Sequence, residues 1–389
     1  MPLIEGDFMK SSHYIRDVIA PAITRLFVWS LLFGIIYLLR SFSLLIFLTF
    51  VFAYIQTHAV DHLATKIKGR TSRVLLVSAT LLAILIAIGT FLAPRVREQA
   101  ELFASHYPKY LKSIDLSIVD LSNNYPLLDR ISSGMTQLKE NPGSWNLHIS
   151  PTARTIQEVF GLEGNHEGTS NIKEIFIALT NIGGKLLATG SAFLLSLLFS
   201  FLIVLDLPRL TASVRSLKDT SIGFIYREVA EDLKQFANTL GRALEAQLFI
   251  GLLNTFLTAI GLYVLGLHEN IAFLSVIVFL CSFVPVAGVF VSSIPICLLA
   301  LQESGVSHML LAIGLIVFIH MIETYILNPK IYGHHLHMNP VLVLSILTIG
   351  GKLFHVWGLI LGVPICTYFF GYYIRRNRVN SLSDNLTET

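Results

Sequence analysis

Long apolar runs separated by shorter polar links dominate the chain. Four of these runs, at residues 74–93, 186–205, 246–267 and 305–327, are close to or above the roughly 20 residues that span a bilayer. A run of this length predicts a transmembrane helix, because in hydrocarbon every backbone polar group has to be hydrogen-bonded within the protein. The pattern therefore predicts an all-α, polytopic helical membrane protein.

Two longer polar segments interrupt this pattern. Residues 95–174 carry ten acidic and eight basic side chains, and the first half of the segment has apolar residues at helical spacing. These residues predict an amphipathic helix: Val96, Phe103, Tyr107, Tyr110, Ile114, Ile118 and Leu121. Residues 222–244 show a similar spacing, which fits either a helix lying along the inner membrane face or an ordinary solvated connecting helix.

The distribution of charged residues predicts the orientation of the chain in the membrane. Only 14% of the residues are charged and the net charge is +3, which excludes a water-soluble surface and a basic nucleic-acid-binding face. Basic residues gather beside the apolar runs, at residues 66–73 and 375–378, and the positive-inside rule then places both termini in the cytoplasm. About eight transmembrane helices satisfy this arrangement. Residues 26–57 form either one long helix or two short ones, and the charges favour a tight hairpin.

These observations divide the chain into seven parts. They are N-terminal transmembrane helices (1–94), an extracytoplasmic segment (95–174), a transmembrane helix ending before Pro208 (175–206), a cytoplasmic amphipathic helix (207–245), two hairpins (246–301 and 315–374) and a cytoplasmic tail (375–389).

The two hairpins share one residue pattern. Residues 246–301 align with residues 315–370 at a constant offset of 69 and without a gap. Apolar residues match by chance in any membrane protein, but aligned polar residues, prolines and cysteines do not. Asn254 aligns with Glu323, Pro295 with Pro364 and Cys297 with Cys366. The chain therefore contains a duplicated hairpin, and the shared direction of the two copies makes it a parallel repeat.

Each copy is interrupted in the middle of its second apolar segment. The interruptions read VPVAG at residues 284–288 and GGKLFHVWG at residues 350–358. Proline removes a backbone donor and glycine loosens the backbone, so both helices are expected to break. Paired interruptions point to a transport pathway, although proline kinks that only help helices pack would look the same. The resulting pathway candidates are Gln247, Asn254, Pro285, Gly288, Glu323, Asn328, Pro329, Gly350, Gly351, Lys352, Gly358 and Pro364.

Glu323 is the ionisable candidate, because an acid inside an apolar helix is costly and by default suggests function. It is expected to exchange a proton or bind a cation, with Asn254 as an uncharged ligand; a structural pair with Lys352 or an interfacial position is the alternative. His334, His335 and His337 are too close together on a short link to predict a metal site. No phosphate-binding loop or hydrolase motif is present, so we expect no enzyme, cofactor or resident metal.

Several short segments of the C-terminal half occur together in a fixed order. They are DLPR at 206–209, LGRALEAQ at 240–247, FVPVAG at 283–288, ETYILNPKIYG at 323–333, NP at 339–340, GGKLF at 350–354 and VP at 363–364. In these segments the chain resembles the autoinducer-2 exporter family, a permease-like family of bacterial inner-membrane proteins. The resemblance covers about 170 residues, with departures at Ala246, which the family usually replaces by glycine, and at residues 355–357, which are often smaller in the family.

The resemblance implies export of a small polar molecule such as autoinducer-2 from the inner membrane, by passive or ion-coupled movement, or sodium-proton antiport. The partners expected are the lipid bilayer, a small-molecule or ion substrate and no nucleic acid, with a homo-oligomer left open. A non-transporting scaffold, which would use residues 95–174 and 222–244 to gather partners, is the alternative of a different class.

Overall fold

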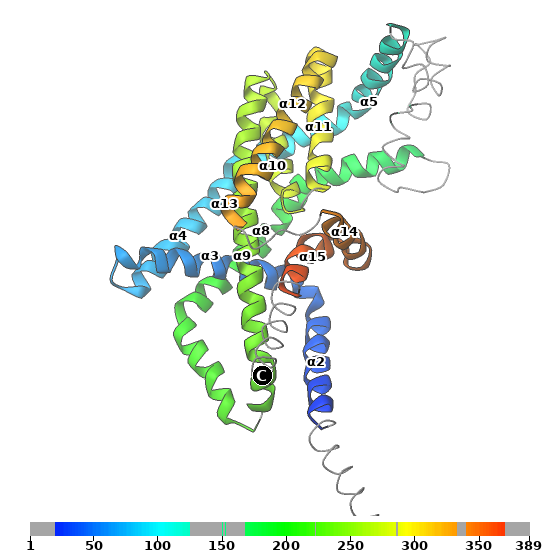
Figure 1. Cartoon of the computed structure of the whole chain (residues 1–389). Coiled ribbons are helices and arrows are strands. Elements are labelled where there is room, and N and C mark those ends of the chain that lie inside the picture. Colours follow the sequence, from blue (N-terminus) through cyan, green and yellow to red (C-terminus); the bar gives the residue numbers. More distant parts are fainter. Residues whose placement is uncertain are drawn as a thin grey trace, which may run out of the picture. The chain divides into compact units, whose positions relative to one another are not determined.

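A computed structural model describes residues 20–124, 150, 152, 168–221, 223–284, 287–332 and 340–369. These residues are almost entirely helical, as the all-α expectation requires (Figure 1). The helices are α2 (Ala20–Leu38), η2 (Leu39–Phe42), α3 (Ser43–His62), η3 (Leu63–Thr65), α4 (Arg70–Ala87), η4 (Ile88–Leu92), α5 (Ala93–Asn124), α8 (Gly168–Ser216), η8 (Leu217–Asp219), α9 (Gly223–Val264), η9 (His268–Asn270), α10 (Ile271–Cys281), α11 (Ala287–Ser304), α12 (Val306–Ile322), η10 (Glu323–Leu327), α13 (Asn328–Tyr332), α14 (Pro340–Phe354) and α15 (Val356–Tyr368).

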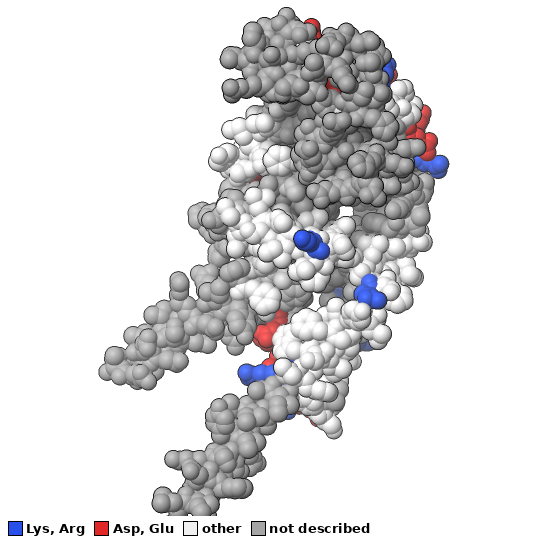
Figure 2. Space-filling model, turned by 90° about the vertical axis from the view of Figure 1, so that its right-hand side faces the viewer, with Lys and Arg blue, Asp and Glu red and all other residues white. Residues whose placement is uncertain are grey.

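Helix length and hydropathy confirm a polytopic membrane protein. Among the described residues five helical stretches are long and apolar enough to cross a membrane, and four further apolar helices are shorter. The four shorter ones are α10, α11, α14 and α15, which form the two interrupted segments. On the face drawn in Figure 2 the described surface is mostly uncharged, with isolated acidic and basic side chains. Such a surface is suited to contact with lipid.

Each interrupted segment folds as a short helical hairpin. α10 packs against α11, and α14 packs against α15, so the chain turns back at each break instead of continuing as one kinked rod (Figure 1). The broken helices expected at both places are therefore present. Residues 26–57, in contrast, form two α-helices joined by η2, and α2 points away from α3 (Figure 1). The tight hairpin favoured by the charges is not found there.

Three helices continue beyond their predicted ends and through the prolines that follow. The helix predicted over residues 74–93 passes through Pro94 into α5, the one predicted over 175–206 passes through Pro208, and α12 leads through η10 into α13 beyond Pro329. The predicted helices 222–244 and 246–267 are likewise one continuous helix, α9. The helix therefore has no end near residue 245, and the division between the two compact units, after Arg242, falls within α9.

The chain divides into two compact units. Unit 1 comprises Met1–Leu82 and Ser191–Arg242. Its core includes Val60, Val74, Val77 and Val204, and a buried polar chain crosses it: Gln56 donates to Ser200 Oγ at 2.8 Å, and Ser78 donates to Gln56 Oε1 at 3.1 Å. These bonds join α3, α4 and α8 through groups that would be costly to leave unpaired inside a membrane protein.

A hydrogen bond from the side chain of another helix allows α8 to continue past Pro208. A proline cannot donate to the carbonyl four residues earlier, which here belongs to Val204. Arg70 Nη2 donates to that carbonyl oxygen at 2.9 Å. The guanidinium group thus replaces the missing backbone donor, and the helix continues to Ser216.

Unit 2, Ala83–Gly190 with Ala243–Thr389, holds the larger core. The predicted amphipathic helix is α5, whose residues Val96, Phe103 and Tyr110 are buried against α10 and α11. The rings of Phe103 and Phe273 lie 5.4 Å apart, and Gln99 Oε1 accepts the backbone N–H of Phe273 at 2.8 Å. This contact satisfies one of the free donors in the first turn of α10 and fixes the start of the first short hairpin.

Glycines set the sharp turns in unit 2. Gly266 has φ +83, and after α9 the N–H of Gly266 donates to the Tyr263 carbonyl while that of Leu267 donates to the Leu262 carbonyl. This is the bonding of a Schellman motif, which favours glycine because the residue is left-handed. Gly305, with φ +76, links α11 to α12 as a single residue and lets the two helices pack side by side.

Candidate functional site

Glu323 lies at the first position of a π-helical turn. Its carbonyl accepts the N–H of Asn328, five residues later, and residues 323–327 form η10. Pro329 follows, and its ring would clash with the carbonyl four residues earlier in an ordinary α-helix. The wider turn avoids that clash. A second π turn, η4, likewise begins six residues before a proline, Pro94. Single π turns are frequent at functional sites.

The carboxylate of Glu323 contacts one amide and one imidazole. Asn254 Nδ2, on α9, donates to Glu323 Oε2 at 2.8 Å, and His320 Nδ1 lies 3.5 Å from the same oxygen. The side chain of Glu323 is only 17% exposed, Asn254 is 6% exposed and the His320 side chain is 44% exposed. Lys352, the alternative partner, makes no ion pair with Glu323 within the described chain.

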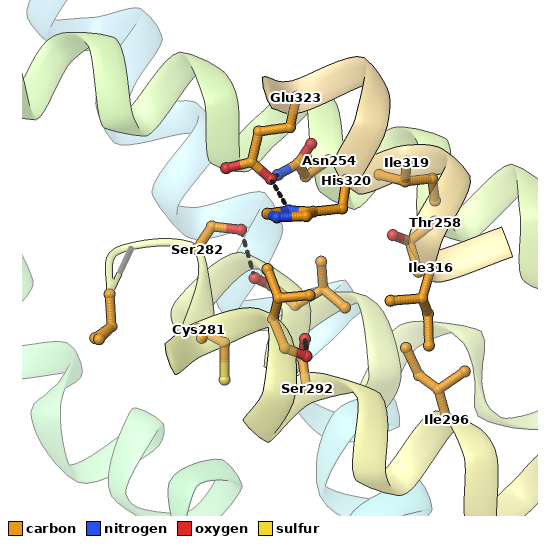
Figure 3. A pocket seen from close by; sticks show the side chains of 14 residues that line it. Asn254, Thr258, Cys281, Ser282, Ser292, Ile296, Ile316, Ile319, His320 and Glu323 are labelled. Atoms are coloured by element: carbon orange, nitrogen blue, oxygen red, sulfur yellow. Dashed lines mark hydrogen bonds and ion pairs between the residues drawn. The ribbon is translucent and has the colours of Figure 1, made fainter. Parts of the chain in front are cut away.

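These groups line a small pocket with a volume of about 50 Å³. Figure 3 shows Glu323, Asn254 and His320 turned toward one another, while Ile296 and Ile316 lie on the other side. The lining comes from α9, α10 with its turn, α11 and the α12–η10 helix: Asn254, Thr258, Val278, Cys281, Ser282, Val284, Gly288, Val289, Ser292, Ile296, Ile316, Ile319, His320 and Glu323. At about 15 Å³ for each occupied water position, the pocket holds about three water molecules.

The turn between α10 and α11 forms one wall of this pocket. Gln247 Nε2 donates to the carbonyl of Ser282, which ties α9 to the turn. A Cβ atom on Gly288 would lie 1.9 Å from the carbonyl oxygen of Cys281, so only glycine fits. The structure thus brings Gln247 and Gly288 to the site, as anchors of its wall. Pro285 lies outside the described residues.

The candidates from the second hairpin do not line the pocket. Gly350 and Gly358 meet where α14 crosses α15, and a Cβ on Gly358 would lie 1.9 Å from the Gly350 carbonyl oxygen. Close helix packing accounts for this pair. Gly351 lies one residue further along α14, Lys352 is exposed near its end, and Pro364 is inside α15. Asn328 and Pro329 belong to the π turn and to α13.

Sequence reasoning missed four polar members of the pocket. Thr258, Ser282, Ser292 and His320 were not candidates, although Thr258 lies one turn after Asn254 and His320 lies three residues before Glu323. Helical spacing from the two predicted residues would have found both. Ser282 and Ser292 had no such signal, because their place depends on how α11 folds back on α10.

Oxygen atoms dominate the polar lining, in the form of one carboxylate, one amide and several hydroxyl groups. Hard cations and protons are the species that such groups bind. No cluster of three or more His, Cys, Asp or Glu residues suited to a resident metal occurs in the described part of the chain.

Comparison with known proteins identifies the family. The model of the AI-2E family transporters matches residues 26–372, which is nearly the whole chain. The chain belongs to the AI-2E transporter family. It is therefore a multi-pass membrane protein of a transporter family, and the resemblance seen in the C-terminal half extends to the N-terminal helices.

Three relatives that align with most of this chain have names that describe transport. YdbI of Bacillus subtilis (strain 168), a candidate transport protein, is 28% identical over 356 residues and covers 90% of each chain. A candidate transport protein of Alkalihalophilus pseudofirmus is 24% identical over 375 residues, 91% of this chain and 89% of the relative. A protein of Halobacillus andaensis named as a sodium-lithium/proton antiporter is 25% identical over 310 residues, 76% of this chain and 80% of the relative.

Proposed function

We propose that this AI-2E transporter exchanges a small metal cation for protons across a bacterial cytoplasmic membrane, with both termini in the cytoplasm. Glu323 is the group that the cation and the proton occupy in turn. The observation that carries the proposal is the environment of its carboxylate: mostly buried in an apolar helix, at the edge of a polar pocket, and hydrogen-bonded to an amide.

Cation–proton exchange depends on the charge of the group that contacts the Glu323 carboxylate. A lysine or arginine beside Glu323 would neutralise the carboxylate permanently and hold it in one state. Asn254 donates a hydrogen bond but brings no charge, and His320, 3.5 Å from the same oxygen, forms an ion pair only when its imidazole is protonated. With a neutral His320 the carboxylate keeps its affinity for a cation or a proton. Because the two compete for one group, only one of them is carried at a time, which is the basic requirement of antiport.

The size and polar lining of the pocket suit a small cation. A volume of about 50 Å³ accepts a cation with one or two waters, and the pocket offers one carboxylate and several neutral oxygen donors to such an ion. The name of the Halobacillus relative supports the cation reading, and the family name supports the export reading. We favour the cation because the pocket has the charge and the oxygen donors for it.

The test uses the purified full chain in liposomes loaded with a pH-sensitive dye. With an acidic interior, added Na⁺ or Li⁺ should collapse the proton gradient in vesicles that contain the protein and leave it intact in empty vesicles. A parallel arm measures uptake of labelled furanone. Furanone flux without cation-dependent proton movement would overturn the proposal in favour of the exporter, and flux of neither would favour the scaffold.

A further inference from the structure

Asn254 carries an unused acceptor. Its Nδ2 donates to Glu323, but its Oδ1 is buried and accepts no hydrogen bond from the described residues, although the residue is 94% buried (6% exposed). Buried acceptors are normally paired, and one without a partner beside a pocket calls for a ligand. A water or a cation in the pocket supplies what the oxygen lacks.

The amide of Asn254 can form favourable contacts both in the empty site and in the cation-bound site. In the empty site Asn254 donates Nδ2 to the carboxylate, as the structure has it. A half-turn of the amide about its Cβ–Cγ bond exchanges Nδ2 for Oδ1, so that two oxygens, one from Asn254 and one from Glu323, face the same point. Oxygen pairs of this kind are ligands for hard cations, and the hydroxyl groups of Thr258 and Ser292 line the same pocket.

The charge of the site then sets the charge of the ion. Of the fourteen residues that line the pocket, Glu323 is the one carboxylate, and the remaining oxygen donors are neutral. Ca²⁺ sites are built from several carboxylates, and their affinity follows the number of charged ligands. When His320, the other titratable group beside this oxygen, is neutral, one carboxylate matches one positive charge.

We propose that Asn254 is the residue that restricts this site to monovalent cations, because it places a neutral oxygen where the second repeat has an acid. The inference rests on the proposed function in that it puts the transported cation at Glu323. The two residues are 69 positions apart, the offset that relates the two hairpins, and yet their side chains touch. An acid at both positions would make a dicarboxylate site.

Equilibrium binding tests this, using detergent-solubilised full chain with radioactive sodium and radioactive calcium as probes. Na⁺ and Ca²⁺ have nearly the same radius, so the comparison isolates charge. The wild type should bind Na⁺ and leave Ca²⁺ unbound. Asn254→Asp should bind Ca²⁺ at least tenfold more tightly than the wild type does, and Asn254→Ala should lose Na⁺ affinity at least tenfold without gaining Ca²⁺.

Asn238→Asp is the matched control, because it adds the same charge to an exposed position of α9 that does not line the pocket. It should bind both ions as the wild type does. The inference is overturned if Asn254→Asp and Asn254→Ala keep the wild-type preference, or if Asn238→Asp gains Ca²⁺ as strongly as Asn254→Asp. Asn254→Ala keeps the question answerable if the aspartate variant fails to fold.

The liposome exchange assay separates this inference from the proposed function. If the wild type exchanges Na⁺ for protons while the Asn254 variants keep its ion preference, the inference alone fails. If the binding preference shifts as expected but the wild type moves no protons, the proposed antiport fails and the monovalent site stands.

Discussion

Asn254 on α9 donates a hydrogen bond from Nδ2 to Oε2 of Glu323 at 2.8 Å, although the two residues lie 69 positions apart in the sequence, the offset at which the two predicted hairpins align. The pocket they line takes its walls from α9, α10 and α11 in the predicted first hairpin and from α12 with η10 in the predicted second hairpin. The site therefore has an amide at one of the two aligned positions, Asn254, and a carboxylate at the other, Glu323.

Glu323→Gln should abolish cation–proton exchange while the protein still folds. The substituted side chain keeps the shape and an oxygen that accepts from Asn254, so the hydrogen bond between the helices survives, but it has no charge to exchange. Gradient collapse by Na⁺ should fall to the rate of empty vesicles, and elution from a sizing column should match the wild type. A variant that exchanges at the wild-type rate would remove Glu323 from the mechanism.

The candidate site shows how far sequence reasoning reaches. The alignment of the two hairpins paired Asn254 with Glu323, and the rarity of acids in apolar helices selected Glu323; the structure brings these two side chains together. Gln247 and Gly288 also lie at the site. The glycines of the second hairpin do not, because a glycine needed for close helix crossing and one needed to open a pathway look the same in a sequence.

Prolines account for most of the differences in the fold. Pro94, Pro208 and Pro329 each follow closely on the predicted end of a helix, and at each the helix continues. At Pro94 and Pro329 a π turn widens the backbone, and at Pro208 Arg70 supplies the donor that proline lacks. The rule that proline ends a helix considers only the neighbouring residues. It takes no account of an arginine 138 positions away from Pro208, or of the packing that stabilises a π turn.

Gly288→Ala should destabilise the first hairpin. The added methyl group would lie 1.9 Å from the backbone carbonyl oxygen of Cys281, and because neither backbone segment can move without opening the turn, we expect a loss of about 1–3 kcal/mol. Denaturant unfolding of the solubilised protein measures this loss. Gly314→Ala, in the middle of α12 with open space around the position, is the control and should be neutral or stabilising by up to about 1 kcal/mol. Equal effects of the two substitutions would contradict the steric argument.

His355→Gly should stabilise the second hairpin. His355 joins α14 to α15 with φ +53 and ψ −133, a conformation that favours glycine. Such strain costs on the order of 1–3 kcal/mol, and the extra freedom of an unfolded glycine offsets about 0.5–1 kcal/mol of the relief. A net gain of about 1 kcal/mol should appear as a higher melting temperature. His308→Gly, within α12, lacks this strain and should lower the melting temperature; a fall in both variants would show that His355 is not strained.

Arg70→Ala should destabilise unit 1, and Pro208→Ala should rescue it. Removing the guanidinium group leaves the Val204 carbonyl without a donor in a buried position, which costs about 1–3 kcal/mol. An alanine at position 208 restores the backbone N–H that donates to this same carbonyl, so the arginine is no longer needed there. In a double-mutant cycle read by denaturant unfolding, the cost of Arg70→Ala should therefore shrink by about 1 kcal/mol or more in the Pro208→Ala background. If the two substitutions are simply additive, Arg70 acts through its charge at the membrane surface, and the helix must tolerate Pro208 by another means.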